Sequence, residues 1–113
     1  IIGISSIASL RAAVRFAGYG AAKAGMNNLS RTLAIELAPK GIRSNIVSPG
    51  QVPTEATTRV GGVPPEKFSD LAAAIPLQRV GSPQDIAAAV LYLVSEAGSW
   101  VTGQNLIVDG GYT

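Results

Sequence analysis

Residues 42–48, IRSNIVS, predict a short β-strand that is followed at once by the turn Pro49-Gly50. Before this strand, apolar residues recur at steps of three and four between residues 19 and 38, which predicts a long helix with one apolar stripe. Pro39 and Gly41 end that helix, the first as a breaker and the second as a left-handed cap. The expected stripe consists of Ala22, Met26, Leu29, Leu33 and Leu37.

Further helices and strands are predicted on both sides of this helix and strand. Residues 1–5 predict a buried strand, residues 65–74 a short helix, and residues 105–110 a final strand. The stretch SPQD, residues 82–85, opens another helix that runs to about Glu96 and is apolar on most sides, so we expect it to be deeply buried. The alternation of strands and helices predicts one α/β domain over residues 1–113, with a parallel sheet covered by helices.

Three strands form a thin sheet, and the apolar helices have more surface than such a sheet can cover. The chain also opens without methionine, on IIGISS. We therefore expect the sequence to be a fragment, with part of the fold upstream of residue 1.

The composition narrows the possible functions. The chain has 113 residues, 47% of them apolar, and a net charge of +2. It has no long basic run that would bind nucleic acid and no apolar run of about 18 residues that would span a membrane. Because cysteine is absent, disulfides and thiolate chemistry are excluded, and a cytoplasmic protein is the default expectation.

The chain also contains no histidine. This absence excludes the Ser-His-Asp triad and the common zinc sites, so we predict no metal centre. Acid–base chemistry near neutral pH must then come from a carboxylate, a lysine or a tyrosine in a suitable environment.

The stretch YGAAK, residues 19–23, supplies such a pair. Tyr19 and Lys23 are four residues apart on a predicted helix and therefore share one face. A neighbouring cation and the start of a helix both favour a phenolate. Ser6 follows the first strand, at the carboxyl edge where parallel sheets place their ligands. Taken singly, the pair is equally compatible with a solvated helix face, and Ser6 with a turn.

Several motifs together resemble the short-chain dehydrogenases/reductases. They are ISSIAS, the spacing of thirteen residues from Ser6 to Tyr19, YGAAKAG, GIRSNIVSPGQVPT and WVTGQNLIVDGG, and they extend from end to end of the chain. The resemblance implies a Rossmann-type doubly wound parallel sheet, here only its C-terminal half. It also implies hydride transfer between NAD or NADP and an alcohol or ketone. The residue that selects NAD or NADP has no counterpart in the chain.

The resemblance implies a role for each matching residue. Tyr19 is the general acid/base, Ser6 polarises the substrate oxygen, and Lys23 supports the phenolate and binds the nicotinamide ribose. Pro49 and Gly50 form the turn beside the nicotinamide.

Val52 and Thr54 would reach the carboxamide or the phosphates of the cofactor, and Asn45 is expected to be structural. Without the family pattern, Pro49-Gly50 is an ordinary turn and Thr54 an ordinary loop residue. Asp109 is expected to organise the carboxyl-terminal turn, and Trp100 to anchor a core or an interface.

The chain departs from the family pattern at the phosphate site. No strand is followed by a glycine-rich phosphate loop, so we predict that these 113 residues alone neither bind the dinucleotide tightly nor turn over substrate. Residues 50–75 correspond to the substrate lid of the family. Its expected pocket contacts are Val60, Val63, Phe68 and Leu71.

A second face of the long helix carries small residues, namely Ala21, Ala24, Gly25 and Asn28. In the family this face packs against a neighbouring subunit, which implies a homodimer or homotetramer.

Two other functions remain open. A catalytically silent relative would use the fold for cofactor sensing or protein binding, although it would have no need of Ser6, Tyr19 and Lys23 together. A standalone association module would fold stably and would not respond to dinucleotide.

Overall fold

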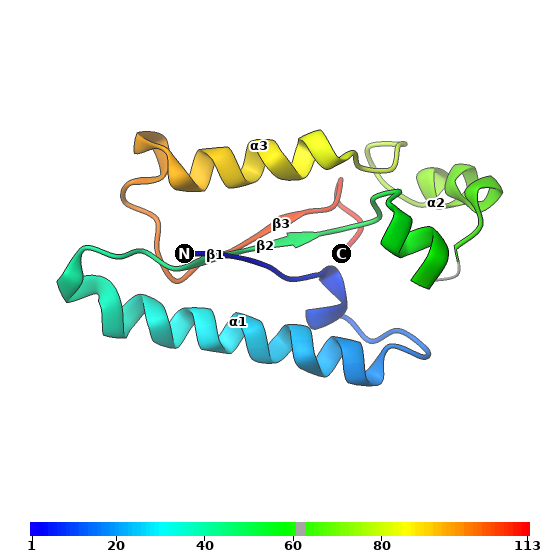
Figure 1. Cartoon of the computed structure of the whole chain (residues 1–113). Helices are drawn as coiled ribbons and strands as arrows, with labels where there is room; N and C mark the ends of the chain where they lie inside the picture. Colours follow the sequence, from blue (N-terminus) through cyan, green and yellow to red (C-terminus); the bar gives the residue numbers. More distant parts are fainter. Residues whose placement is uncertain (61–62) are drawn as a thin grey trace.

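The computed structural model describes residues 1–60 and 63–113; residues 61–62 and the side chain of Val60 lie outside the described part. Strands β1 (Ile2–Ile4), β2 (Asn45–Pro49) and β3 (Asn105–Val108) form a parallel sheet in the order β1-β2-β3. Helix α1 (Ala17–Leu37) covers one face of this sheet and α3 (Pro83–Val94) covers the other (Figure 1). The α/β class and the parallel sheet are therefore as predicted.

Strand β2 is the centre of the core. Ile46 and Val47 are almost fully buried because neighbouring strands pair with β2 on both sides. The buried Asn45 side chain is satisfied, since its Nδ2 donates to the Val101 carbonyl (2.8 Å) and its Oδ1 accepts from the Gln104 amide (3.0 Å). This pairing confirms the structural role predicted for Asn45.

Helix α1 ends as its sequence predicts. It passes at Leu37 into a short helical turn, η2 (Ala38–Lys40), and Gly41 adopts the left-handed conformation with φ 71°. A glycine takes this conformation without the steric cost that a Cβ would impose.

The predicted apolar stripe of α1 coincides only in part with the buried face, since Met26, Leu33 and Leu37 are half-buried but Ala22 is exposed. Leu29 is 58% exposed, whereas Asn27, Ser30 and Ala34 are buried. The helix lies close to the sheet over small and polar side chains, and Ser30 forms a hydrogen bond of 2.9 Å with Ser44. Small residues allow this close approach, and Leu29 is left on the exposed side of the helix.

Helix α3 begins as predicted and is less buried than predicted. Ser82 caps it, and Asp85 completes a capping box by accepting from the Ser82 amide. Leu93 is fully buried, but Leu91 is 66% exposed, because the thin sheet covers one side of the helix only. Trp100 is 99% exposed, so of its two predicted places the core is wrong, and the interface stays a prediction.

The segment between β2 and α3 lies beyond the carboxyl end of β2 (Figure 1). It contains a five-residue helical turn, η3 (Ala56–Val60), that the sequence had not indicated. The predicted helix at 65–74 is confirmed as the turn η4 (Pro65–Lys67) followed by α2 (Phe68–Ala73). Within residues 1–60 and 63–113, no helix combines the length and the apolar character needed to cross a lipid bilayer.

Candidate active site

The candidate site begins at the edge of the sheet where β1 and β2 both end. The two strands are parallel, and Ile4 pairs with Val47 at this edge. The Ser5 amide continues the pairing by donating to the Val47 carbonyl at 2.8 Å. Ser6 and the Pro49-Gly50 turn therefore leave the sheet side by side, which is where parallel sheets bind ligands.

Tyr19 and Lys23 lie together at the start of α1. The Lys23 Nζ atom is 5.6 Å from the centroid of the Tyr19 ring. Phe16 packs edge-on against the same ring, with centroids 5.8 Å apart and an interplanar angle of 76°. Lys23 and Phe16 thus contact the Tyr19 ring from two sides. The side chain remains accessible from solvent, because Tyr19 is 46% exposed.

Lys23 also joins α1 to the end of β1. Its ammonium donates to the Ile4 carbonyl at 2.9 Å, and its own backbone carbonyl accepts from the Ser5 hydroxyl at 3.2 Å. An ammonium has three donors, so two of them stay available for other acceptors. The lysine thus holds a fixed position at the sheet edge and can still bind a ligand.

Ser6 begins a short helical turn, η1 (Ile7–Ser9), that packs against α1. Its hydroxyl oxygen accepts from the Ala8 amide at 3.1 Å. Within the described residues the hydroxyl donates to no acceptor, so its proton can serve a substrate oxygen. A Cβ on Gly20 would lie 2.8 Å from the Ala8 carbonyl oxygen, which shows how closely η1 meets the helix.

The structure thus places the three predicted catalytic residues at one end of the molecule. Ser6 is flanked by Ile4 and Ala8, which both contact α1 beside Tyr19 and Lys23. No hydrogen bond joins Ser6 to Tyr19 within residues 1–60 and 63–113.

The residues predicted to bind cofactor follow β2 in order. The Gly50 amide donates to the Val108 carbonyl at 2.9 Å, and a Cβ on Gly50 would lie 2.6 Å from the Asp109 Cβ. Glycine is therefore required here by the close approach of β3. Pro49 is the last residue of β2 and is half-buried.

Val52 and Thr54 have partners of their own. Val52 is 7% exposed, and its carbonyl accepts from the Thr57 hydroxyl at 3.1 Å. The Thr54 hydroxyl accepts from the Thr57 amide at 3.2 Å and so caps the turn η3. A cofactor that binds to either residue would therefore have to replace these hydrogen bonds or use the groups that they leave free.

Asp109 organises the carboxyl-terminal turn, as predicted. Its carboxylate accepts from the Gly111 amide at 2.9 Å and from the Thr113 amide at 2.8 Å. Partial burial of Asp109 acts to raise its pKa, but the hydrogen bonds from Thr113 and Gly111 hold that pKa below its usual range.

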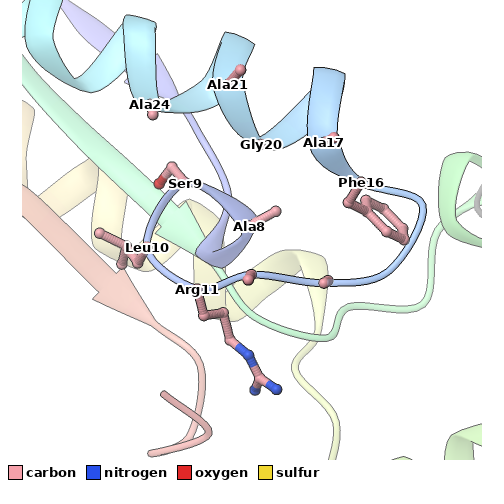
Figure 2. A pocket seen from close by; sticks show the side chains of 11 residues that line it. Ala8, Ser9, Leu10, Arg11, Phe16, Ala17, Gly20, Ala21 and Ala24 are labelled. Atoms are coloured by element: carbon pink, nitrogen blue, oxygen red, sulfur yellow. The ribbon is translucent and has the colours of Figure 1, made fainter.

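Two hollows of the described residues lie beside this site. The larger, of about 440 Å³, is open to solvent and is lined by η1, by the loop after it and by the first turns of α1 (Figure 2). Its lining is mostly alanine with Arg11 and Phe16, and it does not include Ser6, Tyr19 or Lys23. The smaller, of about 280 Å³, lies near the ends of β2 and β3.

Neither lining contains the described residues predicted as lid contacts, which are Val63, Phe68 and Leu71. The lid therefore stays a prediction, and its Val60 side chain lies outside the described part.

One polar contact beside the site, between Asn27 and Ser9, was not predicted from the sequence. Asn27, one turn beyond Lys23 on α1, is 6% exposed and donates to the Ser9 hydroxyl at 2.8 Å. The only indication in the sequence was a polar residue four positions after Lys23, on the same face of the helix. Its partner, Ser9, could not be predicted because it is 18 residues away in the chain.

Comparison with known proteins identifies the family. A family model described as enoyl-(acyl carrier protein) reductase matches residues 1–113. A crystal structure of a short-chain dehydrogenase/reductase from Brucella melitensis, titled glucose/ribitol dehydrogenase, superposes with a TM-score of 0.91 at 38% identity. That match covers 100% of this chain and 44% of the other. The chain belongs to the short-chain dehydrogenase/reductase family. Its three-stranded sheet is accordingly part of a Rossmann-type fold.

Two further relatives indicate the chemistry found in the family. The peroxisomal 2,4-dienoyl-CoA reductase of Saccharomyces cerevisiae is 50% identical over 101 residues, covering 87% of this chain and 34% of the yeast protein. A 7α-hydroxysteroid dehydrogenase, solved with NADH and 7-oxo glycochenodeoxycholic acid, is 40% identical with a TM-score of 0.90. That match covers 98% of this chain and 43% of the dehydrogenase. The chain spans less than half the length of each of these relatives.

Proposed function

We propose that this chain supplies the carboxyl-terminal, catalytic half of an oxidoreductase that transfers a hydride between NAD or NADP and an alcohol or ketone. The observation that carries the proposal is the position of Lys23, whose ammonium lies against the Tyr19 ring and is bound to the end of β1. Membership of the family and the relative solved with NADH support the cofactor class. The residues that would choose between NAD and NADP are not in this sequence.

The residues present fit a nicotinamide nucleotide at the carboxyl edge of the sheet. Lys23 has two donors left for the ribose hydroxyls. Pro49 and Gly50 would lie beside the nicotinamide, while Val52 and Thr54 would approach its carboxamide or the phosphates. When bound, the nicotinamide supplies the hydride acceptor or donor, which no side chain of the chain can replace.

The chain's own residues would handle the proton. In the oxidation direction, Ser6 donates a hydrogen bond to the substrate oxygen and Tyr19, as phenolate, takes the hydroxyl proton. In the reduction direction, the Tyr19 phenol returns that proton to the developing alkoxide.

Other features of the whole protein follow as proposals. Residues 50–75 would act as a substrate lid over this edge. The exposed small residues of α1 would contact a second copy in a homodimer or homotetramer; they are Ala21, Ala24, Gly25 and Asn28. A cytoplasmic location is proposed from the absence of cysteine.

The proposal is tested by assaying the complete protein with NADH and NADPH against ketones that range from cyclohexanone to a 7-oxo bile acid. We expect ketone-dependent oxidation of one nucleotide, and Ser6→Ala should reduce kcat while leaving nucleotide binding intact. Tight nucleotide binding without turnover of any ketone would favour the catalytically silent relative instead.

A further inference from the structure

We propose that Asn27 is a positioning residue for Ser6 and that it acts through the hydroxyl of Ser9. This inference rests on the proposed function, in which Ser6 holds the substrate oxygen. It assigns a task to a buried amide that touches neither substrate nor cofactor.

A chain of hydrogen bonds connects the three residues. Asn27 Nδ2 donates to Ser9 Oγ at 2.8 Å, and Ser9 Oγ donates to the Ser6 carbonyl at 2.6 Å. The Ser9 hydroxyl has a single proton, which goes to Ser6, so its oxygen is the acceptor for Asn27. The direction of the chain is thereby fixed, and it ends on the backbone of the residue whose hydroxyl is proposed to bind substrate.

The burial of Asn27 argues against a purely stabilising role. The residue is 6% exposed, and within the described residues its Oδ1 atom has no hydrogen-bond partner. A buried carbonyl without a partner costs free energy, and an apolar side chain of similar size would avoid that cost. The benefit of asparagine here is its single donated bond, which goes to the turn that carries Ser6.

The contacts of η1 with α1 show what this bond controls. Lys23 binds the Ile4 carbonyl before Ser6, while Asn27 binds Ser9 after it. Lys23 and Asn27 lie four residues apart on one stripe of the helix. The turn that begins at Ser6 is therefore held at both ends by the helix that also carries Tyr19, which fixes the position of Ser6 relative to that helix.

The test compares Asn27→Leu with the unaltered complete protein, using the ketone that is turned over best. We expect kcat to fall roughly tenfold to a hundredfold, because small misplacements of an orienting group have effects of this size. The KM for the reduced nucleotide and the melting temperature should not be impaired. Ser9→Ala, which removes the middle of the chain, should reproduce the loss.

Repeating the Asn27 substitution in a variant that lacks the Ser6 hydroxyl separates a positioning effect on Ser6 from a general disruption of the site. In a Ser6→Ala protein, Asn27→Leu should cause no further loss of kcat, because its effect passes through Ser6. An equal loss in both backgrounds, or no loss in the unaltered protein, would overturn the inference. If Ser6→Ala itself leaves kcat unchanged, the proposed function of the serine fails instead.

Hydrogen exchange provides a readout that needs no substrate. Asn27→Leu and Ser9→Ala should both speed amide exchange in residues 6–9 and leave β2 protected. Unchanged exchange in residues 6–9 would overturn the link between Asn27 and the turn, whatever the activity.

Discussion

The Lys23 ammonium donates a hydrogen bond of 2.9 Å to the carbonyl of Ile4, the last residue of β1. This bond connects the second turn of α1 to the strand end from which Ser6 departs. It keeps the cation beside the Tyr19 ring and leaves two donors directed elsewhere. The same side chain therefore has a structural task and a proposed cofactor-binding task.

Lys23→Met in the complete protein should weaken nucleotide binding and also reduce kcat, by roughly a hundredfold or more, because the site loses the cation that lies beside the Tyr19 ring and is bound to the end of β1. Lys40→Met, at an exposed position beyond the end of α1, is the matched control and should behave like the unaltered protein. Calorimetric nucleotide titration and steady-state kinetics measure the two effects. If Lys23→Met binds the nucleotide as tightly as the unaltered protein, the lysine does not contribute to the cofactor site.

Asp85 makes the stability of the chain sensitive to acid. Two hydrogen bonds from Arg79, at 2.7 and 2.9 Å, and others from Ser82 hold the pKa of Asp85 well below its usual range. A carboxyl group whose folded pKa is depressed stabilises the fold above its unfolded pKa of about 4 and loses that contribution as the pH falls towards the folded value.

Asp85→Asn should therefore lower the melting temperature at pH 7, and the difference from the unaltered protein should shrink steadily as the pH falls below about 4. Asp70→Asn, at an exposed position on α2, is the control and should change the melting temperature little. A difference that is constant from neutral pH into acid would show that the charge of Asp85 is not what stabilises the start of α3.

Gly50→Ala should destabilise the protein, since the added Cβ would lie 2.6 Å from the Asp109 Cβ and 2.7 Å from its Cα. The backbone at Asp109, directly after β3, would have to move away from the proposed cofactor edge. Gly18→Ala is the matched control, because no atom lies within 4 Å of the added Cβ and the position is outside the proposed contact between copies, and helix propensity predicts a gain of up to about 1 kcal/mol. Urea unfolding distinguishes the two; equal effects would contradict the close approach of β3.

The 113-residue chain by itself should not bind NADH or NADPH at micromolar concentration, because its sequence contains no glycine-rich phosphate loop after a strand. Isothermal calorimetry on this chain provides the measurement, with the complete protein as the positive control. Micromolar binding by the short chain would show that its own residues form a sufficient dinucleotide site.

The sequence predicts those features that depend on neighbouring residues in the chain. Ser82 and Asp85 at the start of α3, and Gly41 after α1, are found where capping preferences place them. Tyr19 and Lys23 share a helix face because they are four residues apart.

Features that depend on distant partners were not predicted. The most buried face of α1 is set by contacts such as Ser30 with Ser44, so the apolar pattern wrongly placed Leu29 against the sheet. Asn27 and Ser9 are 18 residues apart, and no local spacing indicates that they meet. These contacts arise only when α1 packs against the sheet.

The most direct test of the central claim is Tyr19→Phe in the complete protein, measured beside Tyr92→Phe, which removes a hydroxyl from the half-exposed tyrosine of α3. The ring of Tyr19 would keep its contacts with Phe16 and Lys23, so nucleotide binding should be nearly unchanged in both variants. Ketone turnover should be lost in the Tyr19 variant, by roughly a hundredfold or more, and kept in the Tyr92 variant. Near-normal turnover without the Tyr19 hydroxyl would contradict its assignment as the proton carrier.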